Sequence, residues 1–434
     1  MRRLYMIVGV VAAGMLAVAG PLPAGGSPTT VGTTPASFTP WLLRSTPNQR
    51  VRELVQCGST MYAVGTISAV KQGTTQYALH NAFSFSATSG AVTAWRPQVN
   101  GTVNSVALTP DCSTAYLGGS FSTVDGIPAA NIAAVDTATG AIETTFAHSA
   151  GSDVETLQYV DGQLVAGGGF NSINGVSRSR IASLDPVTGA VTTYVNFKVS
   201  GNYPNSGTKV YNSQLSHAGT RMLVEGTFTF FGGQARQQIL MLDLGSTSAT
   251  VDPWTSAEFT QACAPKESFY VRAATWSPDD TTVYIATTGY KPASGPGSHN
   301  SDPRAGLCDA AAAFPATAAS VVHRWVNYTG CDSLYGVASD ANNVYVAGHE
   351  RWANNSHGCD VAGPGFVNRP GLGSLGPTSG QATPWNPTRS RGYGADDLLL
   401  TPAGLWIASD NFSDGGAQYC GGVGNKGGIC FLPY

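Results

Sequence analysis

Short stretches of alternating apolar and polar residues, separated by turns that contain glycine, cover most of this chain. In residues 103–146 the alternation predicts four strands, which lie near 103–108, 116–121, 132–135 and 141–146. The third and fourth are joined by Asp136-Thr-Ala-Thr-Gly140, a sequence typical of a tight hairpin loop with glycine at a positive φ. The stretch therefore predicts one unit of four antiparallel strands.

The same unit recurs along the chain. First strands are predicted to begin near residues 51, 103, 154, 210, 271, 334 and 398. The second strands end in small residues, as in Leu117-Gly-Gly-Ser120 and Ala166-Gly-Gly-Gly169, which fit a crowded axis where strands from all units converge. We therefore predict an all-β fold, a seven-bladed β-propeller of four-stranded antiparallel blades.

The last blade runs out of sequence before its fourth strand. It begins at about Asp396, and only three predicted strands follow. The missing strand has a counterpart near the start, because Phe38-Thr-Pro-Trp41 is similar to the outer-strand sequence Thr383-Pro-Trp385. We expect this N-terminal strand to pair with residues 428–432, complete the last blade and close the ring, which removes free sheet edges. Residues 38–434 then form a single domain.

The first residues have the pattern of an export signal. Arg2 and Arg3 precede an apolar stretch, residues 4–19, which is shorter than the roughly 18 or more residues of a membrane span. We predict a signal peptide over 1–24 and a flexible leader over 25–37, which is rich in Pro, Thr, Gly and Ser. A retained N-terminal anchor is the alternative. Since no later stretch is apolar enough to span a bilayer, we expect a secreted, extracellular protein.

Composition narrows the class of protein. Of 434 residues, 42% are hydrophobic and 11% are charged, which indicates a globular chain and not a disordered one. The 53 glycines fit many turns between short strands. The formal net charge is −3 and no basic run occurs, so we expect no nucleic-acid partner.

The cysteine count is eight, and in an exported chain an even number favours disulfides over metal binding. Eight cysteines permit about 105 connectivities. In a propeller blade the loops after strands two and four lie on one face, and the turns after strands one and three lie on the other. Placing the cysteines on these loops and turns predicts four pairs, Cys57–Cys112, Cys263–Cys308, Cys331–Cys359 and Cys420–Cys430.

Several repeat sequences resemble those of a known family. Gly118-Gly-Ser-Phe121, Val124-Asp-Gly126 and Ala133-Ala-Val-Asp136 are similar to the repeat of secreted bacterial propellers described as delta-sixty-repeat or WD-like. A similar repeat occurs in a fungal cortical polarity-marker family. The third blade repeats the pattern with Gly168-Gly-Phe170 and Ile173-Asn-Gly175. The resemblance covers nearly all of the chain after the signal peptide and implies the fold and export, but no catalytic residues.

We expect a ligand site where the central channel opens on the face that carries the loops after strands two and four. The ends of the second strands place His349 and Asp410 there, and the starts of the first strands add acidic residues. Carboxylates and a histidine at this mouth can hold a cation or hydrogen-bond a sugar, and a tryptophan can stack on a sugar ring. Alternatively, the aromatic residues wedge between blades and the acids cap turns. The predicted ligand-binding residues are His349, Glu350, Trp352, Asp332, Asp397 and Asp410.

No sequence pattern predicts a cofactor or a metal site. Residues 371–376 match a dinucleotide-binding pattern by letter, but a turn follows them where that pattern needs a helix. His349-Glu350 is not a zinc-protease motif, because Ala353 stands where the second histidine would be. The Asp-rich hairpin loops lack the ligand spacing of an EF-hand and are explained by turn chemistry.

Two functions remain open. The first is a non-catalytic extracellular binding or scaffold module, whose partner would be an extracellular protein or a glycan. The second is an extracellular carbohydrate-active hydrolase or lyase that uses acidic residues at the channel mouth, because such an enzyme needs two groups with divergent pKa values aimed at one spot. Convergence of Asp332, Asp397, Asp410 and His349 in one concave pocket would favour the enzyme. A structural cell-surface protein is a third hypothesis.

Overall fold

The computed structural model describes residues 30–43, 49–202, 206–260, 263, 270–289, 307–411, 419–424 and 426–434. Within them the secondary structure is almost entirely β, with one short 3₁₀ helix, η1 (Ala257–Thr260). This confirms the prediction of an all-β fold. No helix in the described part of the chain is long and apolar enough to cross a membrane. The predicted signal peptide, residues 1–24, lies outside the described residues.

Seven antiparallel sheets of three or four strands contain most of the strand residues in the described part of the chain. In every sheet the chain runs outward strand by strand, so that neighbours in sequence are neighbours in the sheet. In chain order the sheets are β2 (Arg50–Cys57), β3 (Thr60–Thr66) and β6 (Ala82–Ser86); β7 (Thr102–Leu108), β8 (Thr114–Ser120) and β11 (Ile132–Asp136); β12 (Val154–Val160), β13 (Gln163–Gly168) and β16 (Ile181–Leu184); β18 (Val210–Leu215), β19 (Arg221–Gly226), β22 (Ile239–Leu244) and β23 (Ala249–Val251); β24 (Tyr270–Trp276), β25 (Thr282–Thr288), β26 (Ala310–Pro315) and β27 (Trp325–Tyr328); β28 (Leu334–Ser339), β29 (Val344–Gly348) and β32 (Leu372–Leu375); and β33 (Ala395–Thr401), β34 (Gly404–Ser409) and β37 (Ile429–Pro433).

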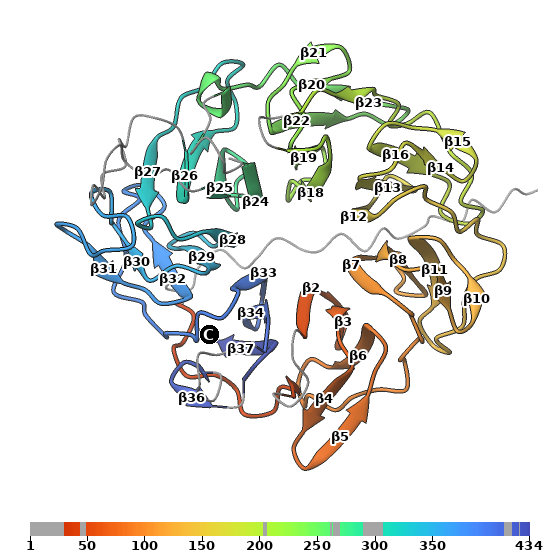
Figure 1. Cartoon of the computed structure of the whole chain (residues 1–434), viewed down its shortest axis with the longest axis horizontal. Helices are drawn as coiled ribbons and strands as arrows, with labels where there is room; N and C mark the ends of the chain where they lie inside the picture. The colour runs from red at the N-terminus through yellow and green to blue at the C-terminus, as the bar shows by residue number, and fades with distance from the viewer. Residues whose placement is uncertain are drawn as a thin grey trace, which may run out of the picture.

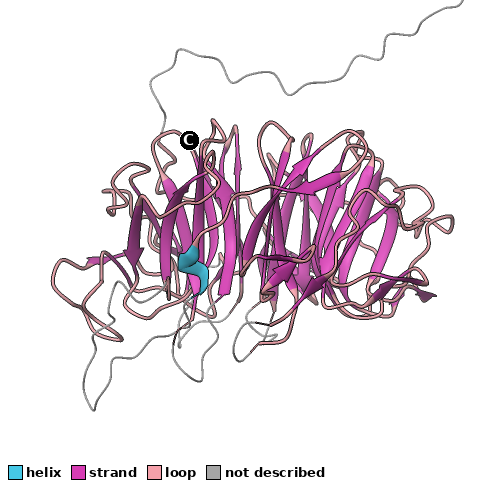
Figure 2. Ribbon diagram, turned by 90° about the horizontal axis from the view of Figure 1, so that it is seen from above, coloured by secondary structure: helices cyan, strands magenta, loops and turns pink. Residues whose placement is uncertain are grey.

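The seven sheets are arranged around a common centre, with the first strand of each sheet innermost (Figure 1). Each first strand contacts the first strands of the two adjacent sheets, and the series returns from β33 to β2. Seen from the side, the strands run across the thickness of the molecule (Figure 2). The first strands therefore surround the axis of the molecule, and their side chains decide what lines it.

The predicted fourth strand is regular in only two of the seven sheets, as β23 and β27. In four others the corresponding segment makes a single bridge, for example Val135 with Ile142. The segment still donates from Glu143 N to Ala134 O over 2.8 Å, but its outer edge has no further strand beside it. Because only one side is held, these outer segments are shorter and less regular than the alternation predicted.

Small two- and three-stranded sheets were not predicted. Most of them fill the connections between second and third strands, and the tightest turns carry residues at positive φ such as Asp125 and Gly126. They are β1 (Trp41–Leu42), β4 (Ala69–Gln72) and β5 (Thr75–Ala78); β9 (Thr123–Val124) and β10 (Ile127–Pro128); β14 (Ser172–Ile173) and β15 (Val176–Ser177); β17 (Val199–Ser200), β20 (Phe230–Phe231) and β21 (Gln234–Ala235); β30 (Trp352–Ala353) and β31 (Val367–Asn368); and β35 (Tyr419–Cys420) and β36 (Val423–Gly424).

The start of the described chain lies against its end. Backbone hydrogen bonds run from Gly32 N to Pro433 O, from Ala36 N to Phe431 O and from Leu42 N to Gly427 O, at 2.7 to 2.9 Å. The only named strand here, β1, pairs with β4 and not with β37. Val31 is fully buried. Residues 30–37, which their composition suggested as part of a flexible leader, therefore pack against the last sheet.

The hydrophobic core lies between adjacent sheets. Tyr62 and Val64 of β3, for example, pack in one cluster with Val103 of β7 and Leu117 of β8. Aromatic side chains reach across to the next sheet, and Trp95 Nε1 donates to Asp136 O over 3.1 Å. Apolar residues on both faces of each sheet are thus covered by neighbouring sheets. The alternation of apolar and polar residues is strongest on the first strands, because only there does one part of the strand face the axis.

Four disulfides are present, and they are the four predicted pairs: Cys57–Cys112, Cys263–Cys308, Cys331–Cys359 and Cys420–Cys430. Cys57 ends β2 and Cys112 lies in the turn after β7, so this bridge joins neighbouring sheets. Each of the other three disulfides joins two cysteines that are separated by less than the length of one repeat. The cysteine prediction is therefore confirmed, because equivalent loops and turns of a repeated sheet lie on equivalent sides.

Candidate binding site in the central channel

Every first strand carries a β-bulge near its start. In each of the seven sheets the register between the first and second strands skips one residue. A bulge inserts one unpaired residue, increases the local twist and redirects a side chain. We call the inserted residues the bulge residues; they are Arg52, Asn104, Glu155, Tyr211, Arg272, Tyr335 and Asp396.

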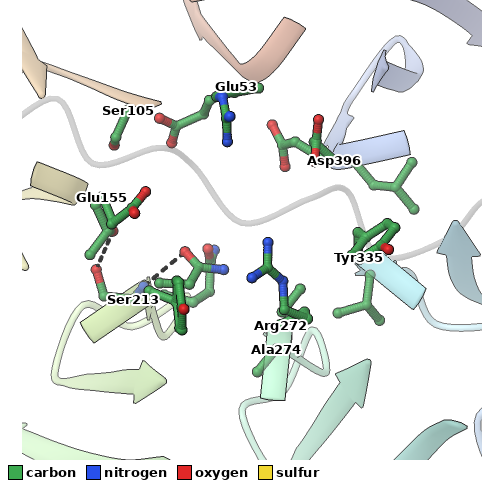
Figure 3. A pocket seen from close by; sticks show the side chains of 18 of the residues that line it. Glu53, Ser105, Glu155, Ser213, Arg272, Ala274, Tyr335 and Asp396 are labelled. Atoms are coloured by element: carbon green, nitrogen blue, oxygen red, sulfur yellow. Dashed lines mark hydrogen bonds between the residues drawn. The ribbon is translucent and has the colours of Figure 1, made fainter. Parts of the chain in front are cut away.

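All seven bulge residues line one cavity of about 160 Å³ on the axis of the molecule, which we call the central cavity. Figure 3 shows Glu155, Arg272, Tyr335 and Asp396 directed into this space from four different sheets. Each bulge residue carries a polar group: two guanidiniums, two phenols, two carboxyls and one amide. Since drug-sized ligands occupy pockets of roughly 300–1,000 Å³, this cavity suits a smaller polar molecule.

A second layer of polar side chains lies beyond the bulges and ties neighbouring sheets together. Asp397 accepts from Leu54 N over 3.0 Å, Glu53 accepts from Val106 N over 2.7 Å, and Ser105 accepts from Leu157 N over 3.0 Å. The equivalent positions on β24 and β28 are Ala273 and Gly336, which have no polar side chain. Those on β12 and β18 are Thr156 and Asn212, so only the side of the axis formed by β24 and β28 lacks a polar side chain in this layer.

Two carboxyls of this second layer have raised pKa values. Burial raises the pKa of Glu53 to about 8, and the nearby carboxylate of Asp397 adds to the effect. Burial likewise raises the pKa of Asp397 to about 6, although its hydrogen bond from Leu54 N acts in the opposite direction. At neutral pH the Glu53 carboxyl is therefore largely protonated and that of Asp397 largely ionised.

Charged side chains at the rim of the central cavity are paired. Arg50 forms an ion pair with Asp396, and Lys209 forms ion pairs with Asp153 and with Glu155, the latter at 2.7 Å. Burial acts to raise the pKa of Asp153, but hydrogen bonds with Glu155, Lys209 and Ser152 outweigh it and bring the pKa to about 2. Both acidic bulge residues, Glu155 and Asp396, are thus paired with cations, and Glu155 shares Lys209 with Asp153.

The two arginine bulge residues provide the remaining positive charge. Arg272 Cζ lies 5.0 Å from the ring centre of Tyr211 and 5.6 Å from that of Tyr335, within cation–π range of both. In the described part of the chain, Arg52 Nε is buried without a hydrogen-bond partner. The pKa of Arg52 is lowered, mainly by burial and also by the positive charges of Arg50 and Arg272. The carboxylates of Asp396 and Glu155 act in the opposite direction and raise it.

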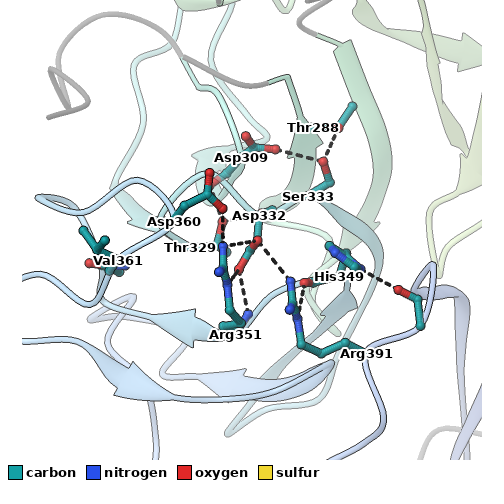
Figure 4. A network of polar contacts seen from close by, with 12 residues as sticks. Thr288, Asp309, Thr329, Asp332, Ser333, His349, Arg351, Asp360, Val361 and Arg391 are labelled. Carbon is teal, nitrogen blue, oxygen red and sulfur yellow. Dashed lines mark hydrogen bonds and ion pairs between the residues drawn. The ribbon is translucent and has the colours of Figure 1, made fainter. Parts of the chain in front are cut away.

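The residues predicted from the sequence fall in two places, of which one is a polar network beside the channel (Figure 4). Asp332 accepts from Arg351 Nε and Nη2 at 2.8 and 2.9 Å and from Arg391 Nη2 at 3.2 Å. His349 Nδ1 lies 2.6 Å from Gly392 O, and His349 O accepts from Arg391 Nε over 2.9 Å. Arg391 therefore joins Asp332 and His349, and the Asp332 carboxylate is neutralised by two guanidiniums.

The other predicted residues near this network are also engaged or enclosed. Asp410 accepts from the backbone N–H groups of Tyr393 and Gly394 and lies 3.4 Å from Arg389 Nη2. Trp352 is half-buried, with Arg351 Cζ 4.3 Å from its ring centre. These contacts correspond to the alternative in which acids cap turns and aromatics pack within the fold.

Glu350 differs from its neighbours in this network. Its side chain is buried, and neither carboxyl oxygen has a hydrogen-bond partner among the described residues. Burial raises its pKa to about 8. The carboxyl is therefore protonated at neutral pH and is not a candidate anion for binding a cation.

The central cavity contains Asp397 but not Asp332, Asp410 or His349. In the described part of the chain the four residues thus do not share one pocket, and no group of three His, Cys, Asp or Glu side chains is placed to hold a metal ion. The sequence reasoning missed the bulge residues Arg52, Asn104, Glu155, Tyr211, Arg272 and Tyr335. A signal was present, because each follows the start of a first strand by one or two positions and is polar or amphipathic.

Several solved structures are similar to this chain. The RRP9 WD40 repeats are similar, with a TM-score of 0.50, 11% identity, and coverage of 92% of this chain and 98% of that one. The WD40 β-propeller domain of Doa1 has a TM-score of 0.47 and 11% identity, with coverage of 93% of this chain and 95% of that one. BamB from Moraxella catarrhalis has a TM-score of 0.43 and 13% identity, with coverage of 92% of this chain and 97% of that one. No family model and no curated protein matches the chain. The likeness to the RRP9 repeats shows the fold alone: the chain is a β-propeller.

Proposed function

We propose that this chain is a secreted, non-catalytic β-propeller that acts as an extracellular binding module and takes a small polar ligand in the central cavity. The observation that carries the proposal is the bulge repeated in all seven first strands. Each bulge aims a polar side chain at the same space, and a cavity lined by convergent polar groups suits a small polar ligand. The resemblance to secreted bacterial propellers agrees with this proposal, since it implies export and no catalytic residues.

The proposal includes a ring of seven blades that the N-terminal segment closes. The hydrogen bonds between residues 32–42 and the end of the chain support it. So does an interaction repeated between sheets: Trp325 Nε1 donates to Pro377 O of the next sheet over 2.8 Å, and Trp385 Nε1 donates to Val31 O over 2.7 Å. For Trp385, the backbone carbonyl of Val31 is thus the acceptor, whereas Trp325 donates to a carbonyl in a loop of the following blade.

Export is supported by two features. Residues 1–24 have the charge and hydropathy pattern of a signal peptide. All eight cysteines are paired in disulfides, which persist in oxidising compartments. An extracellular location places the central cavity in contact with extracellular solutes.

Occluding the central cavity tests the proposal. Tyr211 and Tyr335 show that the bulge accepts tyrosine, so Asn104→Tyr should fold and narrow the cavity. A chain beginning at residue 30 is screened by calorimetry against small sugars, amino acids and organic anions. We expect at least one solute whose affinity falls about tenfold or more in Asn104→Tyr and is unchanged in the control Val322→Tyr, an exposed position. Equal affinity in both variants would place the ligand elsewhere, and the absence of any bound solute would contradict the proposal.

A second candidate function is a carbohydrate-active hydrolase, and one observation favours it. Glu53 and Asp397 lie next to each other at the central cavity, with pKa values of about 8 and about 6. Two neighbouring carboxyls with separated pKa values are the arrangement of an acid and a base in glycosidases. Release of reducing sugar from a polysaccharide panel by the wild type, and its loss in Asp397→Asn, would support this candidate over the binding module.

A further inference from the structure

Positive charge in the lining of the central cavity is concentrated on the two arginine bulge residues, Arg52 and Arg272. Asp396 and Glu155 are held by Arg50 and Lys209. The Asp397 carboxylate, which also lines the central cavity, accepts a hydrogen bond from Leu54 N. The Arg52 and Arg272 guanidiniums lie close enough that each positive charge opposes the other. The carboxylates of Asp396 and Glu155 offset part of this repulsion at Arg52. An anion placed between the two guanidiniums would offset it further.

The surroundings of the two guanidiniums prepare them to meet an anion. Tyr211 and Tyr335 stand on either side of Arg272 and stack against it, which limits the orientations of its planar donors. Arg52 Nε is buried with no acceptor among the described residues, so one donor of Arg52 lacks a partner inside the protein. Arginine donors suit carboxylate and phosphate oxygens, which accept two parallel hydrogen bonds.

We propose that the central cavity binds a small oxyanion, a carboxylate or a phosphate, between the Arg52 and Arg272 side chains. This inference rests on the proposed function, since it names the ligand class for the same site. The cavity volume of about 160 Å³ limits the ligand to a few heavy atoms or to the anionic end of a longer molecule. For scale, a cavity of about 150 Å³ holds a benzene molecule.

The side chains of the cavity also set the orientation of such a ligand. The polar acceptors Glu53, Ser105 and Asp397 belong to β2, β7 and β33, respectively, which are neighbouring first strands. On β24, Ala273 lies next to Arg272 and offers no polar side chain. A ligand that carries a hydroxyl or an amine beside its carboxylate would direct that group toward Glu53 and Asp397. Small hydroxy acids and amino acids therefore fit the site better than simple fatty acids.

Isothermal titration calorimetry in a chloride-free buffer tests the inference, with sodium acetate, sodium lactate and sodium phosphate as separate probes. The variants are Arg272→Met and Arg52→Met, which keep much of the side-chain length and remove the charge. The matched control is Arg96→Met, because Arg96 is exposed and also stacks on a tyrosine, with its Cζ 5.7 Å from the Tyr77 ring, outside the cavity.

We expect saturable binding of at least one probe by the wild type, a loss of about tenfold or more in Arg272→Met and in Arg52→Met, and no change in Arg96→Met. Preference for acetate and lactate identifies a carboxylate site, and preference for phosphate identifies a phosphate site. If either arginine variant does not fold by circular dichroism, Asn104→Tyr replaces it, with the same expected loss.

Two results would overturn the inference. One is the absence of saturable binding of all three probes to the wild type, and the other is equal affinity in the wild type and the folded arginine variants. If the wild type instead binds a neutral solute that Asn104→Tyr excludes, the inference fails while the proposed function stands. If no solute binds in the cavity at all, both fail.

Discussion

At the scale of single residues, three buried glutamates distinguish this chain. Burial raises the pKa values of Glu53, Glu225 and Glu350 to about 8. Glu225 and Glu350 have carboxyl oxygens with no hydrogen-bond partner in the described part of the chain. Uncharged carboxyls at these positions can be tolerated inside the fold, whereas ionised ones would be desolvated without compensation.

The first prediction concerns Glu225→Gln. The folded state keeps the Glu225 proton up to about pH 8, while the unfolded state loses it near its ordinary pKa of 4.5. Stability is therefore lost as the pH rises through this window, by up to about 1.4 kcal/mol per pH unit for one carboxyl. Glutamine resembles the protonated acid and does not titrate. Urea denaturation should find the variant equal to the wild type near pH 5 and more stable at pH 8.5. A stability difference that does not change with pH would contradict this.

The second prediction concerns Glu53 and anion affinity. Ionisation of Glu53 above its pKa of about 8 adds a negative charge to a cavity that also holds Asp397, Asp396 and Glu155 opposite Arg52 and Arg272. The affinity for acetate, which stays ionised throughout, should therefore fall severalfold between pH 7 and pH 9. The Glu53→Gln variant should show a much smaller decrease. A wild-type affinity that is constant or rises over this range would contradict the assignment.

At the scale of elements, the hairpin loop between third and fourth strands is built by one aspartate. Asp185 Oδ1 accepts from Val187 N at 3.1 Å, Thr188 N at 2.7 Å and Thr188 Oγ1 at 2.8 Å. Asp136 makes the same three contacts in the preceding sheet. These hydrogen bonds hold the pKa of Asp185 below its ordinary value, and the bond from the Thr188 amide has the largest effect. The carboxylate organises the loop as turn chemistry predicts.

The third prediction is that Asp185→Ala lowers the free energy of unfolding by about 1 kcal/mol, because three hydrogen bonds within an exposed loop are lost. Urea denaturation at pH 7 measures the change. Asp185→Asn keeps the acceptor oxygen and should lose less. Since the aspartate pKa is depressed in the folded state, the difference between wild type and Asp185→Ala should shrink as the pH falls below about 4. An Asp185→Asn variant as unstable as Asp185→Ala would contradict the hydrogen-bond explanation.

Elements also show how far the sequence alone leads. The alternation located the first and second strands and the hairpin loops, and strand direction gave all four disulfides. The alternation alone did not reveal the bulges, because inserting one residue into a strand of about seven barely changes the pattern. The candidate site was missed for the same reason: Arg52 and Arg272 occupy positions that resemble the solvent face of a strand. Asp397 was found, whereas Asp332 and Asp410 proved to be engaged in local pairing.

At the scale of the whole molecule, the two ends of the described chain pack against each other. Val31 and Leu42 are buried, and Phe38 packs against Trp406 and Phe431. Without residues 30–43, β37 would lose two hydrogen bonds and the segment just before it a third. Exposed sheet edges also promote association between chains.

The fourth prediction compares chains that begin at residue 30 and at residue 44. Burial of each large aliphatic side chain is worth about 1.5–3 kcal/mol, so the shorter chain should unfold at a clearly lower urea concentration. Its transition should also depend on protein concentration, because the exposed edge associates. Replacing residues 30–33 alone, which removes Val31, should give an intermediate effect. Equal unfolding midpoints for the two chains would show that the N-terminal segment does not close the ring.

The most direct test of the whole account is the position of an anion in the channel. Crystals of the chain beginning at residue 30, soaked in sodium selenate, allow the anion to be located from the anomalous scattering of selenium. We predict a selenium peak on the axis of the molecule, with selenate oxygens within hydrogen-bond distance of both Arg52 and Arg272. A central cavity that holds only solvent at saturating selenate, or a selenium peak elsewhere on the surface alone, would contradict the account.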